Sequence, residues 1–265
     1  MQFGGSERQP SSERKLFVTQ RLVVKIGSNV ITEGATKEKP LNAEFIDNVA
    51  RQCSELFKSS VEVVIVSSGA VASGRNLLHI EEHDIRDKQV EAVFGQPTLI
   101  GTWVEAFKKF GVVAGQALIT ENDLEEGKNV LRKSLKHGVV IVNWNDAVNS
   151  DEMRAFMRLA DNDHGAAEVA EAIDADTLLL VTDVEGVIDA KGQLIEDGSQ
   201  INDDDIFFEG SDKGTGGMVT KVKVLKDLAQ KGIQGIITGT KQQDFILKVA
   251  KGNTGGRTSF QSNRN

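Results

Sequence analysis

Short apolar runs rich in β-branched residues alternate along this chain with longer segments that have helical spacing. The apolar runs lie at residues 21–26, 61–66, 112–119, 139–142, 177–181 and 234–238, and each predicts a strand. Helical spacing is clear after Asn42, which can cap a helix, and again from Ala166 to Ile173. This alternation predicts an α/β fold in which helices cover both faces of a mainly parallel central sheet.

Polar and small residues follow most of the predicted strands. The first strand contains Lys25 and runs into a predicted tight turn at residues 27–29, and later strands run into Ser68, Asp146 and Asp183. In sheets of this class, ligands bind beyond the carboxyl ends of the strands. We therefore expect these four side chains to share one crevice, although Asp146 and Asp183 also fit ordinary strand-to-turn positions.

The long helical region at residues 87–110 contains the sequence Gly95-Gln96-Pro97. Its apolar residues otherwise keep helical spacing. A proline inside a helix removes a backbone N–H and clashes with the preceding turn. The sequence therefore predicts a kink at this point, or a break between two helices.

Composition places the chain among globular proteins and narrows its partners. Its 265 residues, 39% hydrophobic and 26% charged, suit one large domain or two small ones, with residues 1–20 and 261–265 as polar tails. The net charge of −8 argues against nucleic-acid binding. Cys53, the only cysteine, excludes an intrachain disulfide, and its spacing predicts a buried helix position. Because no long apolar run is present, we expect no membrane span and a cytoplasmic location.

Two lysines and an aspartate are the strongest candidates for chemistry. Lys25 interrupts a buried strand, where its ammonium group must either meet an anion or reach solvent. The residues Thr215-Gly216-Gly217 open a helix that carries Lys221 in its first turn, a pattern typical of an anion cradle. Asp163 begins another helix and could hold both lysines beside a transferring phosphoryl group, or could simply cap that helix.

No standard phosphate-binding or nucleophile motif is present. The chain has no GxxxxGK[ST], no GxGxxG after a strand and no GxSxG. The sequence Ser67-Ser68-Gly69 could form a nucleophile turn, but no histidine follows a later strand to act as its base. The pattern therefore favours phosphoryl transfer, which needs positioning and charge stabilisation more than covalent chemistry by the protein.

Seven motifs together resemble the amino-acid kinase family in their order and approximate spacing. They are KIGSNVIT, VVIVSSGAVASGR, VFGQPTLIG, VNWNDAV, ADNDHGAA, LLLVTDVEGV and GTGGMVTK. The resemblance covers about residues 21–260 and implies a three-layer αβα sandwich. It also implies an acceptor-binding lobe at about residues 21–174 and a nucleotide-binding lobe at about residues 175–260, with no C-terminal PUA domain.

The resemblance implies roles for individual residues. Lys25, Asp163 and Lys221 would be catalytic. The residues that match the acceptor site of the family are Ser68, Gly69, Asp146 and Asn162. Those that match its ATP site are Lys25, Gly27, Ser28, Thr182, Asp183, Thr215, Gly216, Gly217, Met218, Val219, Thr220 and Lys221. Mg²⁺ would be held mainly by ATP, so no protein metal ligand is expected.

Within the family, the motifs are most similar to those of enzymes that phosphorylate the γ-carboxylate of L-glutamate in proline biosynthesis. The resemblance implies a homo-oligomer, dimeric or tetrameric, and an acyl phosphate product that passes to a glutamyl phosphate reductase. Two alternatives stay open. One is a family member with another carboxylate, carbamate or phosphate acceptor, and the other is a nucleotide-binding regulatory relative without turnover.

Three features depart from the family pattern, and all three lie on the acceptor side. Trp144 stands where relatives usually carry Glu, residues 149–160 form a longer segment than usual, and His164-Gly165 replaces Asn-Leu. The resemblance therefore specifies the reaction type more firmly than the acceptor.

Overall fold

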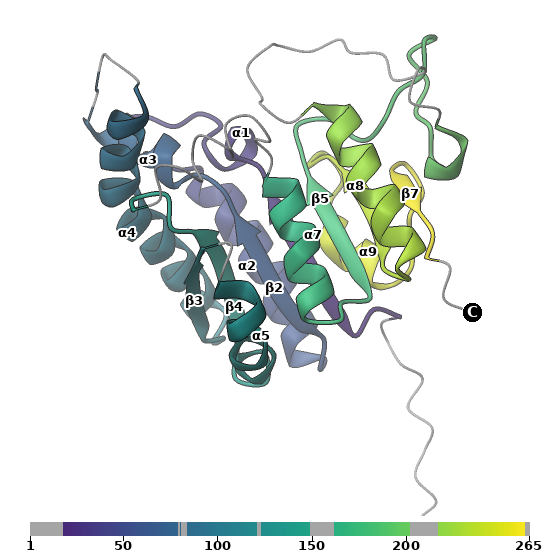
Figure 1. Cartoon of the computed structure of the whole chain (residues 1–265), viewed down its shortest axis with the longest axis horizontal. Coiled ribbons are helices and arrows are strands. Elements are labelled where there is room, and N and C mark those ends of the chain that lie inside the picture. Colours follow the sequence, from purple (N-terminus) through teal and green to yellow (C-terminus); the bar gives the residue numbers. More distant parts are fainter. Residues whose placement is uncertain are drawn as a thin grey trace, which may run out of the picture.

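A mainly parallel sheet forms the centre of the molecule (Figure 1). The computed structural model describes residues 18–78, 80, 84–120, 123–148, 162–201 and 217–262. Within these ranges the sheet has seven strands in the order β3-β4-β2-β1-β5-β6-β7, and only β7 is antiparallel to its neighbour. The strands are β1 (Arg21–Ile26), β2 (Glu62–Ser67), β3 (Ala114–Ile119), β4 (Val139–Trp144), β5 (Thr177–Val181), β6 (Gln234–Thr238) and β7 (Thr258–Phe260).

Helices cover both faces of the sheet, which confirms the predicted three-layer αβα architecture. One face packs against α2 (Ala43–Lys58), α4 (Ile85–Lys109) and α9 (Phe245–Ala250), and the other against α5 (Asp123–Ser134), α7 (Asn162–Ala172) and α8 (Met218–Gln230). The described residues also include α1 (Ser28–Ile31), α3 (Ala70–Leu78), which packs on α4, and the short 3₁₀ helix η1 (Gly198–Gln200).

The alternation of side chains along β1 shows how one strand serves both layers. Leu22 and Val24 belong to the core that packs on α2 and α4, whereas Val23 belongs to the core that packs on α7 and α8. Because Lys25 follows the same alternation as Val23, its side chain also points toward the α7 and α8 layer. The strand pattern therefore decides on which side of the sheet the lysine lies.

One of the two outcomes predicted for the region around Pro97 is wrong: the helix is not broken there, because α4 is one helix from Ile85 to Lys109 with Pro97 inside it. Pro97 has no N–H to donate to the carbonyl of Val93, a residue that is 52% exposed. Gly95 has a packing role, since a Cβ at this position would lie 1.8 Å from the carbonyl oxygen of Ala70 on α3. The glycine therefore permits close contact between α3 and α4 and does not end the helix.

Local predictions near the N-terminus have mixed outcomes. The segment after β1 forms the four-residue helix α1, not the predicted tight turn. Asn42 caps α2 as predicted, since its side chain accepts a hydrogen bond from the backbone N–H of Phe45 at 3.0 Å. Cys53 is fully buried in α2, as its spacing predicted, and burial raises the pKa of its thiol.

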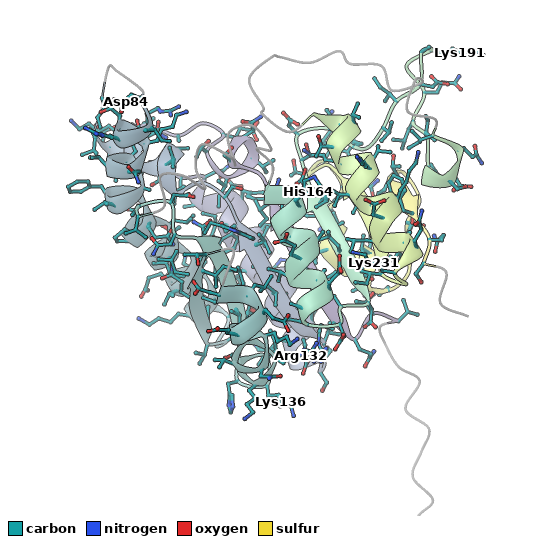
Figure 2. All side chains as sticks on the ribbon, viewed as in Figure 1. Asp84, Arg132, Lys136, His164, Lys191 and Lys231 are labelled. Carbon is teal, nitrogen blue, oxygen red and sulfur yellow. The ribbon has the colours of Figure 1, made fainter. Side chains whose placement is uncertain are left out.

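The carboxyl ends of the parallel strands and the N-terminal ends of α7 and α8 meet at one edge of the molecule, the upper edge in Figure 1. Figure 2 shows His164, at the start of α7, toward this edge, and Arg132 and Lys136, at the end of α5 and just beyond it, at the opposite edge. No helix in the described part of the chain combines the length and apolar composition that a membrane crossing requires.

Candidate functional site: a lysine–aspartate cluster beside an acceptor pocket

Lys25, Asp163 and Lys221 come together at this edge, although they are far apart in the sequence. The Nζ of Lys25 lies 2.5 Å from Oδ1 of Asp163, and the Nζ of Lys221 lies 2.8 Å from Oδ2 of the same carboxylate. Asp163 is fully buried, and the side chains of Lys25 and Lys221 are only 6% and 13% exposed. We call these three residues the lysine–aspartate cluster.

Each member of the cluster is placed by a different element. Lys25 comes from β1, Asp163 from the first turn of α7 and Lys221 from the first turn of α8. The helix dipole favours a carboxylate at the start of a helix and disfavours an ammonium group there. Asp163 is therefore stabilised by α7, whereas Lys221 needs a nearby anion, which Asp163 supplies.

The charges of the cluster define what it can do chemically. Buried charges are costly unless they are paired, so one carboxylate shared by two ammonium groups holds both in fixed positions. The three side chains together carry one net positive charge. Such an arrangement attracts an anion, and its fixed ammonium groups can stabilise negative charge that develops in a transition state.

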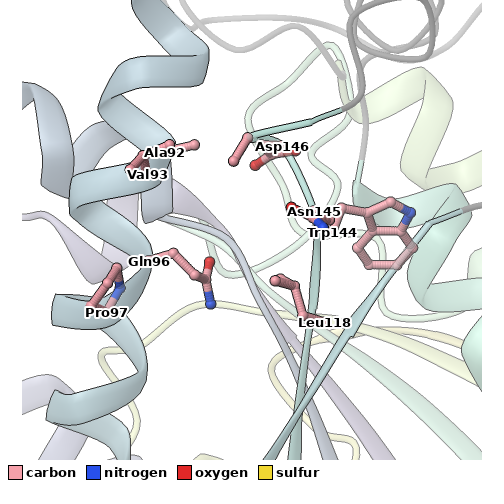
Figure 3. A pocket seen from close by; sticks show the side chains of 9 residues that line it. Ala92, Val93, Gln96, Pro97, Leu118, Trp144, Asn145 and Asp146 are labelled. Atoms are coloured by element: carbon pink, nitrogen blue, oxygen red, sulfur yellow. The ribbon is translucent and has the colours of Figure 1, made fainter.

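A pocket of about 260 Å³ lies between α4 and the ends of β3 and β4 (Figure 3). It is lined by Ala92, Val93, Gln96, Pro97, Leu118, Trp144, Asn145, Asp146 and Ala147. This volume is smaller than that of typical drug-sized ligand sites and suits a ligand of amino-acid size. We call it the acceptor pocket, after the acceptor-binding role that the resemblance implies for Asp146, which stays a prediction.

Asp146 supplies the carboxylate of the acceptor pocket. Burial raises the pKa of its carboxyl group to about 6, because desolvation disfavours the charged form. At neutral pH the group is still mostly ionised. A half-buried carboxylate of this kind can bind the ammonium group of a small ligand.

Gln96 and Asn143 belong to the same region but were missed by sequence reasoning. The Nδ2 of Asn143 donates a hydrogen bond to Oε1 of Gln96 at 2.7 Å, and Oδ1 of Asn143 accepts one from the backbone N–H of Trp144 at 2.9 Å. These bonds tie α4 to the end of β4. The one available signal was the polar Asn143 directly after the apolar run of β4.

Two other predicted acceptor residues, Ser68 and Gly69, are not among the described residues that line the acceptor pocket. Ser68 is half-buried, and its backbone N–H donates to the carbonyl of Ile26 at 3.1 Å. Gly69 has φ of +114°, and a Cβ there would lie 2.8 Å from Cγ2 of Ile31, so a glycine is required. Asn162 begins α7, but its side chain lies outside the described part of the structure. The single crevice shared by Lys25, Ser68, Asp146 and Asp183 stays a prediction.

Four of the residues that are predicted to bind ATP follow β1 and β5. The N–H of Gly27 donates to the carbonyl of Val181 at 3.4 Å, which ties the ends of these strands together. Ser28 begins α1 and is exposed. Thr182 donates a hydrogen bond from its hydroxyl to the carboxylate of Asp183 at 2.9 Å. The role of these residues in ATP binding stays a prediction.

The start of α8 contains further residues that are predicted to bind ATP. Gly217 occupies the cap position and has no side chain that could accept a hydrogen bond from the first turn. Met218, Val219 and Thr220 form that first turn together with Lys221. Thr215 and Gly216, also predicted to bind ATP, lie outside the described residues.

The described residues contain no group of three or more His, Cys, Asp or Glu side chains arranged to hold a metal ion. Both carboxylate oxygens of Asp163 contact ammonium groups. The carboxylate of Asp163 is therefore engaged in holding the two lysines.

Comparison with known proteins identifies relatives over nearly the whole chain. The amino acid kinase family model matches residues 20–239. A glutamate 5-kinase from Clostridium acetobutylicum is 33% identical over 255 residues, which cover 89% of this chain and 93% of that protein. A glutamate 5-kinase from Dehalococcoides mccartyi is 36% identical over 256 residues, which cover 89% of this chain and 67% of that protein.

Proposed function

We infer a function from one premise: the chain belongs to the amino acid kinase family. We propose that it is an ATP-dependent kinase that phosphorylates the γ-carboxylate of L-glutamate, yielding glutamyl 5-phosphate and ADP in the first step of proline biosynthesis. The convergence of two buried lysines on Asp163 carries the proposal of phosphoryl transfer. The names of the relatives support glutamate as the acceptor.

The proposed mechanism rests on charge stabilisation. The γ-carboxylate of glutamate is ionised at neutral pH, so it needs no general base before it attacks the γ-phosphorus of ATP in line. The main obstacle is repulsion between two anions. Lys25 and Lys221 would offset it by placing ammonium groups beside the transferring phosphoryl group, while Asp163 keeps both lysines oriented.

We assign the acceptor to residues 21–174 and ATP to residues 175–260. The N-terminus of α8, with Gly217 at its cap and Lys221 in its first turn, supports a phosphate-binding role for the second part. We propose that Thr182 and Asp183 at the end of β5 contribute to the same site. Mg²⁺ would be held mainly by phosphate oxygens of the nucleotide, because the carboxylate of Asp163 already contacts two ammonium groups.

For the acceptor, we propose that Asp146 binds the α-ammonium group of glutamate. The support is its position in a pocket of amino-acid size and the raised pKa of its carboxyl group, which together mark a desolvated anion. Ser68, Gly69 and Asn162 would contact the remainder of the substrate, as the resemblance implies. An exposed carboxylate would bind an ammonium group more weakly, since water competes for both charges.

We further propose that the chain forms a homo-oligomer in the cytoplasm and passes its product to a glutamyl phosphate reductase. Support for association comes from α4, where Val90, Val93, Phe94 and Val104 are between 37% and 54% exposed. An exposed apolar helix face often marks a protein contact. The reactivity of an acyl phosphate toward water supports rapid transfer to a reductase.

A turnover panel tests the proposed function. ADP release from ATP would be measured with glutamate, aspartate, N-acetylglutamate and inorganic phosphate, and the acyl phosphate trapped with hydroxylamine. We expect ADP release and hydroxamate with glutamate above all, and loss of both in Lys25→Ala but not in Lys37→Ala, which replaces an exposed lysine. ADP release with only one of the other acceptors would show that this acceptor, and not glutamate, is the substrate. ATP binding without ADP release under any condition would favour the regulatory alternative.

A further inference from the structure

Trp144 and Gly165, two of the residues that depart from the family motifs, are in direct contact. A Cβ placed on Gly165 would lie 2.2 Å from Cζ2, 2.4 Å from Cη2 and 3.0 Å from Cε2 of Trp144. The six-membered ring of the indole therefore occupies the space that any other side chain at position 165 would need. The absence of a side chain at Gly165 on α7 thus leaves the space that the large side chain of Trp144 on β4 fills.

This contact joins the two halves of the proposed site. Trp144 ends β4 and is directly followed by Asn145 and Asp146, which line the acceptor pocket. Gly165 lies in α7, two residues after Asp163 of the lysine–aspartate cluster. Figure 3 shows the indole directed away from Gln96 and Pro97, that is, away from α4.

The indole of Trp144 is held in place by burial and by contacts with neighbouring elements, so a shift of one neighbour would move the other. Trp144 is 8% exposed and belongs to the same core as Ala166 and Ala170 of α7. Its backbone N–H is bonded to Asn143, which in turn is bonded to Gln96 on α4. A continuous set of contacts therefore runs from α4, along the wall of the acceptor pocket, to the first turn of α7.

We propose that Trp144 is a positioning residue that sets the distance between the acceptor pocket and Asp163, and that it does so through its size-matched contact with Gly165. The inference rests on the proposed phosphoryl transfer. A methyl group on residue 165 would have to push the indole or the start of α7 aside. Either movement changes where Asp163 holds its two lysines relative to the acceptor.

A double-substitution cycle tests this pairing. Gly165→Ala should lower kcat at least 10-fold while the KM for ATP stays within about 2-fold, because the nucleotide contacts on α8 are retained. Trp144→Leu alone should lower kcat about 3- to 10-fold through loss of the contact. Combining the two should give a higher kcat than Gly165→Ala alone, because leucine lacks the ring atoms that clash.

Gly127→Ala is the matched control, since Gly127 lies within helix α5 with nothing within 4 Å of an added Cβ. It should keep the wild-type kcat. The inference is overturned if folded Gly165→Ala keeps the wild-type kcat, if the effects on kcat simply multiply, or if only the melting temperature changes. Should Gly165→Ala fail to fold, Trp144→Leu and Trp144→Phe decide, and wild-type kcat in both overturns the inference.

A measurement without turnover separates this inference from the proposed function. The chain has two tryptophans, so Trp103→Phe leaves Trp144 as the single indole fluorophore. Adding ATP without acceptor should shift the emission of Trp144, because the ring packs on the helix that holds Asp163. Unchanged emission of Trp144, with ATP binding verified by calorimetry, overturns the inference. If the wild-type protein binds ATP but releases no ADP with any acceptor of the turnover panel, only the proposed function is contradicted.

Discussion

Replacing Asp146 by Asn tests whether the half-buried carboxylate of the acceptor pocket binds the ammonium group of the substrate. The substitution keeps the shape of the side chain and removes its charge. A hydrogen bond between charged groups contributes about 1.5–3 kcal/mol, so the KM for glutamate should rise on the order of 10- to 100-fold. The KM for ATP should not change, because none of the residues proposed to bind ATP lines the pocket.

The same substitution should make the protein more stable at neutral pH. The carboxyl group of Asp146 has its ordinary pKa of 3.8 in the unfolded chain and a pKa of about 6 in the folded one. Between these values the folded protein binds more protons, so the stability of the wild type falls as pH rises through this window. The gap is equivalent to at most about 3 kcal/mol, and partial exposure reduces this to about 1–2 kcal/mol. The asparagine variant escapes this loss.

Two assays therefore check one residue. Urea unfolding at pH 4 and at pH 7.5 should show the stability advantage of Asp146→Asn only at the higher pH, and Asp227→Asn, which replaces an exposed aspartate on α8, should show none. In the wild type, the KM for glutamate should rise as pH falls below about 6, since the carboxyl group becomes protonated. A KM in Asp146→Asn equal to that of the wild type would refute the assigned role.

Three further substitutions address the cluster and the helix packing. Lys221→Ala should abolish ADP release, whereas Lys223→Ala, which replaces an exposed lysine two positions later, should retain it. Similar rates of ADP release in the two variants would contradict the catalytic role of Lys221. Asp163→Asn should lower the free energy of unfolding by about 3–5 kcal/mol in urea, because two buried ammonium groups lose their shared anion, and a loss under about 1 kcal/mol would be inconsistent. Gly74→Ala should lower the free energy of unfolding by about 1–3 kcal/mol, since a Cβ would lie 1.8 Å from the carbonyl oxygen of Glu91. An unchanged melting temperature in calorimetry would disprove this.

The six parallel strands were predictable because each contains a short apolar run between turn signals, whereas the three-residue β7 (Thr258–Phe260) was not predicted. The runs at residues 177–181 and 234–238 coincide with β5 and β6. A local rule predicted a kink or a break at Pro97, and the break is wrong, because α4 continues through this residue. Helix continuity depends on where the proline faces, and a single sequence does not contain that information.

The candidate site was predictable to a lesser extent. Lys25 was identifiable because a charged residue inside an apolar strand is unusual, and the order of motifs then led to Asp163 and Lys221. The contacts that depend on how elements pack were not predictable. The hydrogen bond from Asn143 to Gln96 is one example, since it requires the end of β4 to lie beside the middle of α4.

The burial of Cys53 also has a practical consequence for spectroscopy. It is the only cysteine in the sequence, it is fully inside the core, and burial disfavours its reactive thiolate. A maleimide dye or spin label should therefore leave the native protein unmodified. A second cysteine placed on the surface of α5 or α8 would then be labelled selectively, so that distances could be followed during catalysis without first removing the native thiol.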